Sequence, residues 1–376
     1  MFRRMNGMIM ILVAAIIVLS GCGQSGVSTQ GTLAKSKVTD IVGREVNVPV
    51  LANRIVAIGP GVLRLVCYDQ AAEKVVGVEN VETQWPEAIR PYILAYPQLK
   101  NLPVIGQGGP EYVPNMEKLV EVKPDVIFVS SVLVNGSQAD ELQSKTGIPV
   151  VVLSYSHGRV GYFDDDLYRS LQLIGQITGN EQRANNVIAF LKNCRQDLDR
   201  RTKDIPANKK PTVYAGALSM KGTYGIESTQ AQYPPFVAIN AKNLADETGT
   251  TGSVMIDKEK LLVWNPDIIF IDELGLNLVR EDYKNNPQFY QSLRAFKNGR
   301  IYVQIPYNFY ATNIGTALAD AYYAGKVVYP AHFSDVDPSQ KANEIYQFLL
   351  GKPLYQQIAN GDGGFKKLNL AESSQN

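Results

Sequence analysis

A stretch of thirteen residues occurs twice in the chain, and this internal repeat constrains the fold more than any other feature. Residues 117–129 read EKLVEVKPDVIFV, and residues 259–271, which lie 142 positions later, read EKLLVWNPDIIFI, with seven positions identical. Each copy predicts an amphipathic helix, a Pro-Asp turn that ends it, and a buried strand. We therefore expect two α/β lobes of related construction, with Pro124 and Pro266 in separate sheets.

The rest of the chain alternates short apolar runs with longer amphipathic segments, which is typical of parallel sheets covered by helices on both faces. Runs of β-branched character predict strands at residues 54–58, 75–77, 126–129, 150–153, 212–215, 268–271 and 301–304. Helices are expected between them, for example at residues 116–122 and 140–146. The predicted fold class is α/β, with two Rossmann-like lobes built on parallel sheets.

A long helix is predicted between the two copies of the repeat. Residues 181–201 contain no Gly or Pro, and Thr178-Gly179-Asn180 is expected to supply the break and the N-cap before them. Apolar side chains recur at three- and four-residue spacing, at Ala184, Val187, Ile188, Leu191, Cys194 and Leu198. We interpret this segment as a single helix that joins the lobes, and a peripheral helix of one lobe is the alternative.

The first 37 residues are typical of an export signal followed by a tether. Arg3 and Arg4 precede an apolar run over residues 8–19 that is too short to span a bilayer core of about 30 Å comfortably. The following Leu19-Ser20-Gly21-Cys22 resembles a bacterial lipobox, which implies cleavage before Cys22 and lipidation of its thiol. Residues 23–37 predict a flexible tether. An uncleaved membrane anchor is the alternative.

These signals give the expected division of the chain. It comprises a signal peptide (1–21), a lipidated tether (22–37), an N-terminal lobe (38–165), a helical region with the interlobe helix (166–205) and a C-terminal lobe (206–376).

Composition excludes several functions. The 37 Lys and Arg residues against 36 Asp and Glu give a formal net charge of +1, which provides no broad field for nucleic acid. Two His and three Cys leave little for a zinc cluster or disulfide framework, and Cys67 and Cys194 are expected to be buried and unpaired. No phosphate-loop, nucleophile-elbow or His-Glu-x-x-His motif is present. An exported α/β hydrolase, whose triad would need His157 or His332, is the alternative from another class.

Several phrases, together with the lipobox and the repeat, resemble the helical-backbone (class III) substrate-binding proteins of ABC importers, a group that includes ferric-siderophore, haem and vitamin B12 binders. They are TDIVGREVNVP at 39–49, RIV at 54–56, NMEKL at 115–119, KPD at 123–125 and TGIPV at 146–150. The resemblance covers residue 38 to about residue 358. The phrases at 225–229 and 306–310 resemble a subset described as iron-complex binders.

The resemblance implies a monomeric lipoprotein, not an enzyme, that is held on the outer face of the cytoplasmic membrane by the lipid on Cys22. It also implies delivery of a ligand to a permease dimer with its ATPase. A lipoprotein that supplies an envelope enzyme without an importer is a further alternative. One feature departs from the family. Its members carry a Thr-Glu pair early in the helix after the first strand, where this chain has residues 59–64, GPGVLR.

Candidate ligand-binding residues follow from the rule that ligands of open parallel sheets bind beyond the carboxyl ends of the strands. In the first lobe the rule selects Pro60, Gly61, Gln107, Gly108, Ser130, Ser131, Tyr155 and His157. In the second lobe it selects Tyr224, Glu227, Ser228, Asp272, Glu273, Tyr307, Asn308 and Tyr310. His157 either caps a metal or makes a plain polar contact, Asp272 and Glu273 are alternatively solvated loop charges, and the Tyr307–Tyr310 cluster is alternatively core packing.

This set is rich in aromatic rings and hard oxygen donors, which favours a prechelated metal over a bare ion. The expected ligand is an iron(III) chelate or a similar metallated macrocycle, with a corrinoid or haem as the alternative and no intrinsic cofactor. Glu117 and Glu259 hold equivalent places in the repeat, and the resemblance implies that they engage arginines on the two permease subunits. The alternative is that each merely favours its helix dipole.

Overall fold

The computed structural model describes residues 34–109, 114–155, 164–219, 222–360 and 363–370. The described residues from Ala34 onward form one unit. They begin with an antiparallel hairpin of β1 (Lys35–Thr39) and β2 (Glu45–Pro49). The predicted signal peptide and most of the predicted tether lie outside the described residues.

The first lobe is built on a four-stranded parallel sheet with the order β4-β3-β5-β6. Its strands are β3 (Ile55–Ile58), β4 (Val75–Gly77), β5 (Val126–Ser130) and β6 (Val150–Leu153). Its helices are α1 (Val62–Tyr68), α2 (Val81–Gln84), α3 (Pro91–Ala95), α4 (Met116–Glu121), α5 (Gly136–Thr146) and α6 (Asp165–Thr178). Strands β3, β5 and β6 are buried along their whole length, as expected for a sheet covered on both faces.

The second lobe has a five-stranded sheet with the order β13-β12-β11-β7-β9. It contains β7 (Thr212–Gly216), β9 (Lys242–Asn243), β11 (Ile268–Asp272), β12 (Ile301–Gln304) and β13 (Lys366–Lys367), of which only β13 is antiparallel. A separate antiparallel pair joins β8 (Ser228–Ala231) to β10 (Gly252–Met255).

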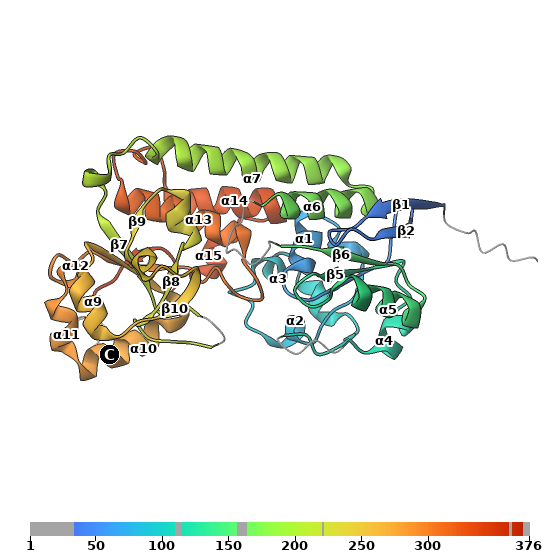
Figure 1. Cartoon of the computed structure of the whole chain (residues 1–376), viewed down its shortest axis with the longest axis horizontal. Coiled ribbons are helices and arrows are strands. Elements are labelled where there is room, and N and C mark those ends of the chain that lie inside the picture. Colours follow the sequence, from blue (N-terminus) through green and yellow to red (C-terminus); the bar gives the residue numbers. More distant parts are fainter. Residues whose placement is uncertain (1–33, 110–113, 156–163, 220–221, 361–362, 371–376) are drawn as a thin grey trace, which may run out of the picture. The chain divides into compact units, whose positions relative to one another are not determined.

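The helices of this half are α8 (Pro234–Ala238), α9 (Lys258–Trp264), α10 (Leu276–Asn285), α11 (Pro287–Ser292), α12 (Arg294–Lys297), α13 (Ile314–Val328), α14 (Pro338–Leu350) and α15 (Tyr355–Ile358). Figure 1 shows the chain in sequence colours and labels these helices, α8 excepted. The two lobes on parallel sheets confirm the predicted fold class, whereas the antiparallel strands were not predicted.

The two copies of the repeat lie in separate sheets, as predicted, and share detailed geometry. Helices α4 and α9 are followed by residues in the left-handed region, Lys123 (φ 44°) and Asn265 (φ 45°). The aspartates of the Pro-Asp turns, Asp125 and Asp267, accept backbone N–H groups at the start of the neighbouring strand, at 2.8–2.9 Å. The motif therefore ends a helix and ties its strand to the next one in both lobes.

Helix α7 (Glu181–Thr202) has the predicted length within one residue. Gly179, at φ 82°, ends α6 and provides the predicted break, because glycine adopts this conformation without strain. Asn180 does not cap α7 through its side chain. Its amide nitrogen instead donates to the backbone carbonyl of Asp69 at 2.9 Å, so Asn180 holds the predicted N-cap position without a side-chain cap and fastens α7 to the first lobe.

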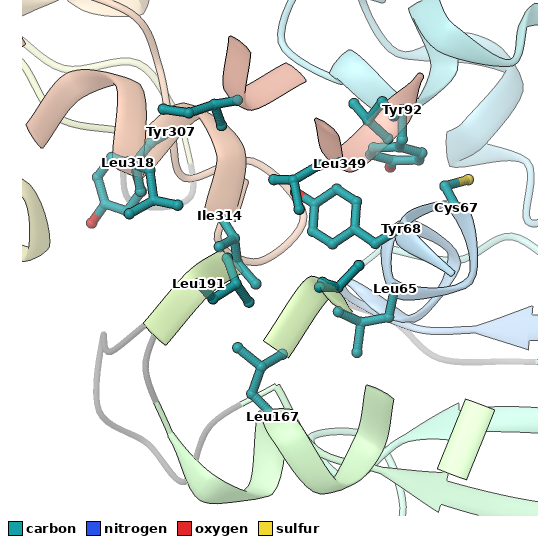
Figure 2. Close-up of a cluster of buried hydrophobic side chains, with 14 of the residues drawn as sticks. Leu65, Cys67, Tyr68, Tyr92, Leu167, Leu191, Tyr307, Ile314, Leu318 and Leu349 are labelled. Atoms are coloured by element: carbon teal, nitrogen blue, oxygen red, sulfur yellow. The ribbon is translucent and has the colours of Figure 1, made fainter. Parts of the chain in front are cut away.

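One hydrophobic cluster extends through both lobes, in addition to a separate cluster in each, so the lobes also pack together through elements other than α7. Helix α14 packs on α1 and α3 of the first lobe, and α13 packs on α7, α8 and α14. Figure 2 shows Tyr68 of α1 in one cluster with Ile314 of α13 and Leu349 of α14. The N–H of Gly315 also donates to the hydroxyl of Tyr68 at 3.2 Å. Helix α7 therefore joins the lobes, as predicted, and the packing of α13 and α14 with it into a helical base was not predicted.

Cys67 and Cys194 are buried and unpaired, as predicted. Burial raises the pKa of the Cys194 thiol to about 11. None of the helices in the described part of the chain combines the length and apolar character that crossing a membrane requires.

Candidate functional site

Glu79 lies two residues beyond β4, at the carboxyl edge of the first sheet, and connects the two lobes. Its side chain is 3% exposed, and its Oε2 accepts the N–H of Gly59 at 2.9 Å. The same oxygen accepts the hydroxyl of Tyr310, from the second lobe, at 2.8 Å. The Tyr310 oxygen in turn accepts the N–H of Gly109 at 3.2 Å. A carboxylate from one lobe and a phenol from the other are thus hydrogen-bonded, and each also accepts one backbone N–H group.

This carboxylate is buried, and its pKa is perturbed. Burial raises the pKa of Glu79 to about 7, although the hydrogen bonds from Gly59 and Tyr310 oppose the shift. Among the described residues, no Lys, Arg or His side chain forms an ion pair with Glu79. A buried acidic group with a perturbed pKa at a strand end is a common property of functional sites.

Three aromatic rings pack beside this oxygen pair. Trp85, which follows α2, makes edge contacts with the rings of Phe309 and Tyr310, at centroid distances of 4.9 and 5.3 Å. All three side chains are half-buried. The site therefore combines hard oxygen atoms with a partly accessible aromatic surface contributed by both lobes.

Glycines allow the loops of the first lobe to approach one another at this junction. Gly61 has φ +82°, and a Cβ atom there would lie 2.5 Å from the ring of Tyr155. Gly108 has φ +69°, and its Cβ would lie 2.8 Å from the Cβ of Glu79. The predicted loops at 59–61 and 107–109 are thus brought together with Tyr155 and Tyr310.

Arg64 of α1 fixes the position of the loop that carries Phe309 and Tyr310. The Arg64 side chain is 1% exposed, and its terminal nitrogens donate to the four carbonyl oxygens of residues 309–312 at 2.8–3.3 Å. It also donates to the hydroxyl of Tyr155 at 3.1 Å. Tyr310 and Ala311 adopt positive φ angles of 50° and 63°, which cost energy for non-glycine residues. The buried guanidinium offsets this cost.

Three predicted residues of the second lobe are enclosed by protein. The hydroxyl of Ser228 donates to a backbone carbonyl at 2.6 Å, and that of Tyr307 donates to Gln230 Oε1 at 2.7 Å. The carboxylate of Asp272 accepts the N–H of Leu274 at 3.0 Å, and burial raises its pKa to about 8. Asp272 is therefore not a solvated loop charge, and the structure does not bring these three side chains to a surface.

The other predicted residues have mixed positions. Glu227 lies 3.6 Å from Lys258, and Glu273 accepts the N–H of Gly364 at 3.3 Å. His157 and Cys22 lie outside the described residues. Buried residues are Gly108 and Ser130, half-buried residues are Pro60, Ser131, Tyr224, Asn308 and Tyr310, and exposed residues are Gln107, Glu117, Glu259 and His332.

Sequence reasoning missed Glu79, Trp85 and the role of Arg64. Glu79 would have been found by applying the strand-end rule to β4, whose strand was predicted but whose end was not searched. Arg64 carried a weaker signal, since it is the one charged residue in the apolar run of residues 62–68. No local pattern distinguishes Trp85.

Two α/β lobes that share a helical base and present loops to each other at their carboxyl edges define a two-lobed substrate-binding protein. A family model agrees, and the chain belongs to the periplasmic binding protein family, whose model matches residues 55–306.

Three curated relatives are similar to most or much of the chain. The molybdate-binding protein MolA of Haemophilus influenzae is 26% identical over 84% of this chain and 91% of its own length. The uncharacterized ABC transporter substrate-binding lipoprotein YvrC of Bacillus subtilis is 22% identical over 80% of this chain and 90% of its own length. The iron-uptake system-binding protein of the same species is 24% identical over 52% of this chain and 59% of its own length.

Solved structures share the fold. MolA of H. influenzae bound to molybdate has a TM-score of 0.65 at 23% identity, covering 85% of this chain and 98% of that one. A periplasmic solute binding protein from Veillonella parvula has a TM-score of 0.68 at 20% identity, covering 91% of this chain and 99% of that one. The chain is thus a substrate-binding protein of the ABC-transporter type, and these relatives are named as binding proteins rather than enzymes.

Proposed function

We propose that this chain captures an iron(III) chelate or a related metal complex at the junction of its lobes, outside the cytoplasm, and delivers it to the permease of an ABC importer. The observation that carries the proposal is the pair formed by Glu79 and Tyr310, one oxygen donor from each lobe at 2.8 Å. Carboxylate and phenolate oxygens are hard donors that suit iron, and the ring of Trp85 offers a flat surface to an organic chelator.

The charge of the site also supports a metal complex. A buried carboxylate without a cation is destabilised by desolvation, and a ligand that brings positive charge or a metal with open positions removes that penalty. The free-energy cost of burying ionised Glu79 is therefore smallest when such a ligand is bound. Ionised Glu79 is the form that interacts with the metal, so affinity should increase as pH rises through about 7.

An oxyanion is the second candidate, because the relative MolA is named as a molybdate-binding protein. Gly59 and Gly61, with φ angles of 90° and 82°, form a loop whose N–H groups suit an anion in principle. The N–H of Gly59, however, is already bonded to the carboxylate of Glu79. An oxyanion would have to displace or approach a negative charge there, which disfavours it near neutral pH.

We expect the substitutions Glu79→Gln and Tyr310→Phe each to weaken binding of a ferric chelate by roughly tenfold or more, because each removes one charged or phenolic oxygen. The probes are ferric citrate, a ferric tris-catecholate complex, haemin, cyanocobalamin and molybdate, titrated against the protein by calorimetry and tryptophan fluorescence. The parent should bind a ferric complex more tightly at pH 8 than at pH 6, and Glu79→Gln should remove most of that difference.

The exposed Glu247 provides a matched control, since it takes no part in the hydrogen bonds of Glu79 and Tyr310 and Glu247→Gln should leave affinity unchanged. Saturable binding of molybdate with no binding of any iron complex would refute the iron proposal and favour the oxyanion. Binding of haemin or cyanocobalamin alone would select the macrocycle alternative.

The anchoring that we propose rests on Cys22, which lies outside the described residues. We expect the mature protein to begin at Cys22 and to carry lipid there, so that it fractionates with membranes. The substitution Cys22→Ala should leave the protein without lipid, either released from the membrane or still carrying its signal peptide. Its ligand affinity should not change. Mass spectrometry of the mature protein is the measurement, and a free, unmodified Cys22 thiol would contradict the proposal.

A further inference from the structure

The second lobe contains a cavity that the proposed function does not use. Its volume is about 530 Å³, which lies within the range of small-molecule sites in proteins, roughly 300–1,000 Å³. Helices α10, α11 and α12 contribute to its lining, together with the start of β12 and residues 367–370. Among the described residues that line it, none is acidic.

This cavity lies at the opposite end of β12 from the proposed ligand site. Ile301, which lines the cavity, is the first residue of the strand. The loop that carries Tyr310 follows Gln304, which is the last residue. A strand of four residues extends over roughly 10 Å. A molecule in the cavity would therefore not compete for space with a metal complex bound beside Tyr310.

Most of the lining is apolar and belongs to the core of this lobe. Ile301, Leu368 and Leu370 are buried members of one hydrophobic cluster. The half-buried rings of Tyr283 and Phe296 pack against the same cluster and also line the cavity. The core thus extends to the cavity and offers it two aromatic rings, which suit a flat apolar group.

Two lysines give the same cavity a positive charge. Lys297 of α12 and Lys367 of β13 are exposed, and in the described part of the chain neither ammonium group has an ion-pair or hydrogen-bond partner. Gly299 has φ +58°, and a Cβ atom there would lie 3.3 Å from Lys367 Nζ, so this glycine leaves room for the ammonium group. Two positive charges at one cavity without an acidic partner attract an anion.

We propose that this cavity is a second binding site, and that its ligand is a small organic carboxylate that carries an aromatic ring. The ring packs against Tyr283 and Phe296, and the carboxylate binds the ammonium groups of Lys297 and Lys367. The apolar lining favours a carboxylate of this kind over inorganic phosphate, because a small, strongly hydrated anion gains nothing from the rings and loses its water. The site is independent of the site at Glu79 and Tyr310.

The test titrates the full chain by calorimetry with 3-phenylpropionate, its neutral amide, acetate and inorganic phosphate. The parent should bind 3-phenylpropionate saturably at one site, and the amide should bind about tenfold more weakly or less well still. Acetate and phosphate should not saturate. Raising the salt to about 0.5 M should weaken binding of 3-phenylpropionate, since exposed ammonium groups are screened.

Substitutions locate the binding site. Lys297→Gln and Lys367→Gln should each weaken binding of 3-phenylpropionate about three- to tenfold, whereas Lys297→Arg and Lys367→Arg, which keep the charge, should weaken it less. Lys352→Gln is the matched control, because Lys352 is exposed and does not line the cavity. Glu79→Gln should also leave this affinity unchanged, which separates the cavity from the junction of the lobes.

Several results would overturn the proposal. They are the absence of saturable binding of 3-phenylpropionate at about 10 mM, equal affinity for the acid and its amide, and unchanged affinity in both lysine-to-glutamine variants. Saturable binding of phosphate in place of 3-phenylpropionate would refute the assigned ligand class. Loss of binding in Glu79→Gln, with binding retained in the lysine variants, would place the carboxylate at the junction instead. Binding of ferric complexes by the lysine variants, measured separately, should equal that of the parent.

Discussion

Replacement of Arg64 by Met is expected to lower the free energy of unfolding by about 3–5 kcal/mol, because four carbonyl oxygens of residues 309–312 would lose their buried donor. Methionine fills a similar volume, so the effect reports the lost hydrogen bonds rather than a cavity. The positive φ angles of Tyr310 and Ala311 would then no longer be held, and the loop should relax. Equilibrium unfolding in urea, followed by circular dichroism, measures the change.

Arg200 is the matched control for this substitution, since its side chain is 75% exposed and, among the described residues, pairs with the nearby Asp197. Arg200→Met should change stability by less than about 0.5 kcal/mol. Arg64→Lys should lie between the parent and Arg64→Met, because one ammonium group cannot serve four carbonyls in the fork geometry of a guanidinium. A loss below about 1 kcal/mol in Arg64→Met would show that the loop does not depend on this side chain.

The substitution Asp272→Asn is expected to stabilise the protein at neutral and alkaline pH, on the order of 3–5 kcal/mol. Burial raises the pKa of Asp272 to about 8, whereas an unfolded aspartate titrates near the ordinary value of about 3.9. Between these values the folded state retains a proton that the unfolded state releases. The parent therefore loses stability as pH rises from about 4 to about 8, and the loss is complete above that window.

Asparagine keeps the oxygen that accepts the N–H of Leu274, so the local cap should survive the substitution. The difference between parent and variant should be small at pH 4, where folded Asp272 is protonated and unfolded Asp272 is about half protonated, and should grow up to about pH 8. Urea unfolding at pH 4, 6 and 8 measures it. A difference that does not vary with pH would contradict a protonated Asp272 in the folded protein.

Much of the fold was predictable because its signals are local. The repeat, the Pro-Asp turns and the break at Gly179 each depend on a few neighbouring residues, and the structure confirms them. Asn180 occupies the predicted N-cap position, but its side chain does not cap α7 because it bonds to Asp69 instead. The helical base was missed for a related reason. Nothing in α13 or α14 indicates that their apolar faces pack on the other half of the chain.

The candidate site was predictable only where strand ends reveal it. The structure brings the loops at 59–61 and 107–109 together with Tyr310 at the junction, but the selection also included Ser228 and Tyr307, which are enclosed. A strand-end rule places a residue near an edge and does not decide whether its side chain turns inward. The contact between Glu79 and Tyr310 joins positions 231 residues apart, and no local pattern carries such a pairing.

The core shared by the two halves has a consequence for how this protein can change over time. Leu349 of α14 lies against the α13 backbone at Gly315, whose N–H bonds to Tyr68 of the opposite lobe. A substitution at such a position must be accommodated by residues that belong to the other half. Although both lobes contain the same helix–turn–strand unit, neither can be exchanged as a module between relatives without repacking the base on which it stands.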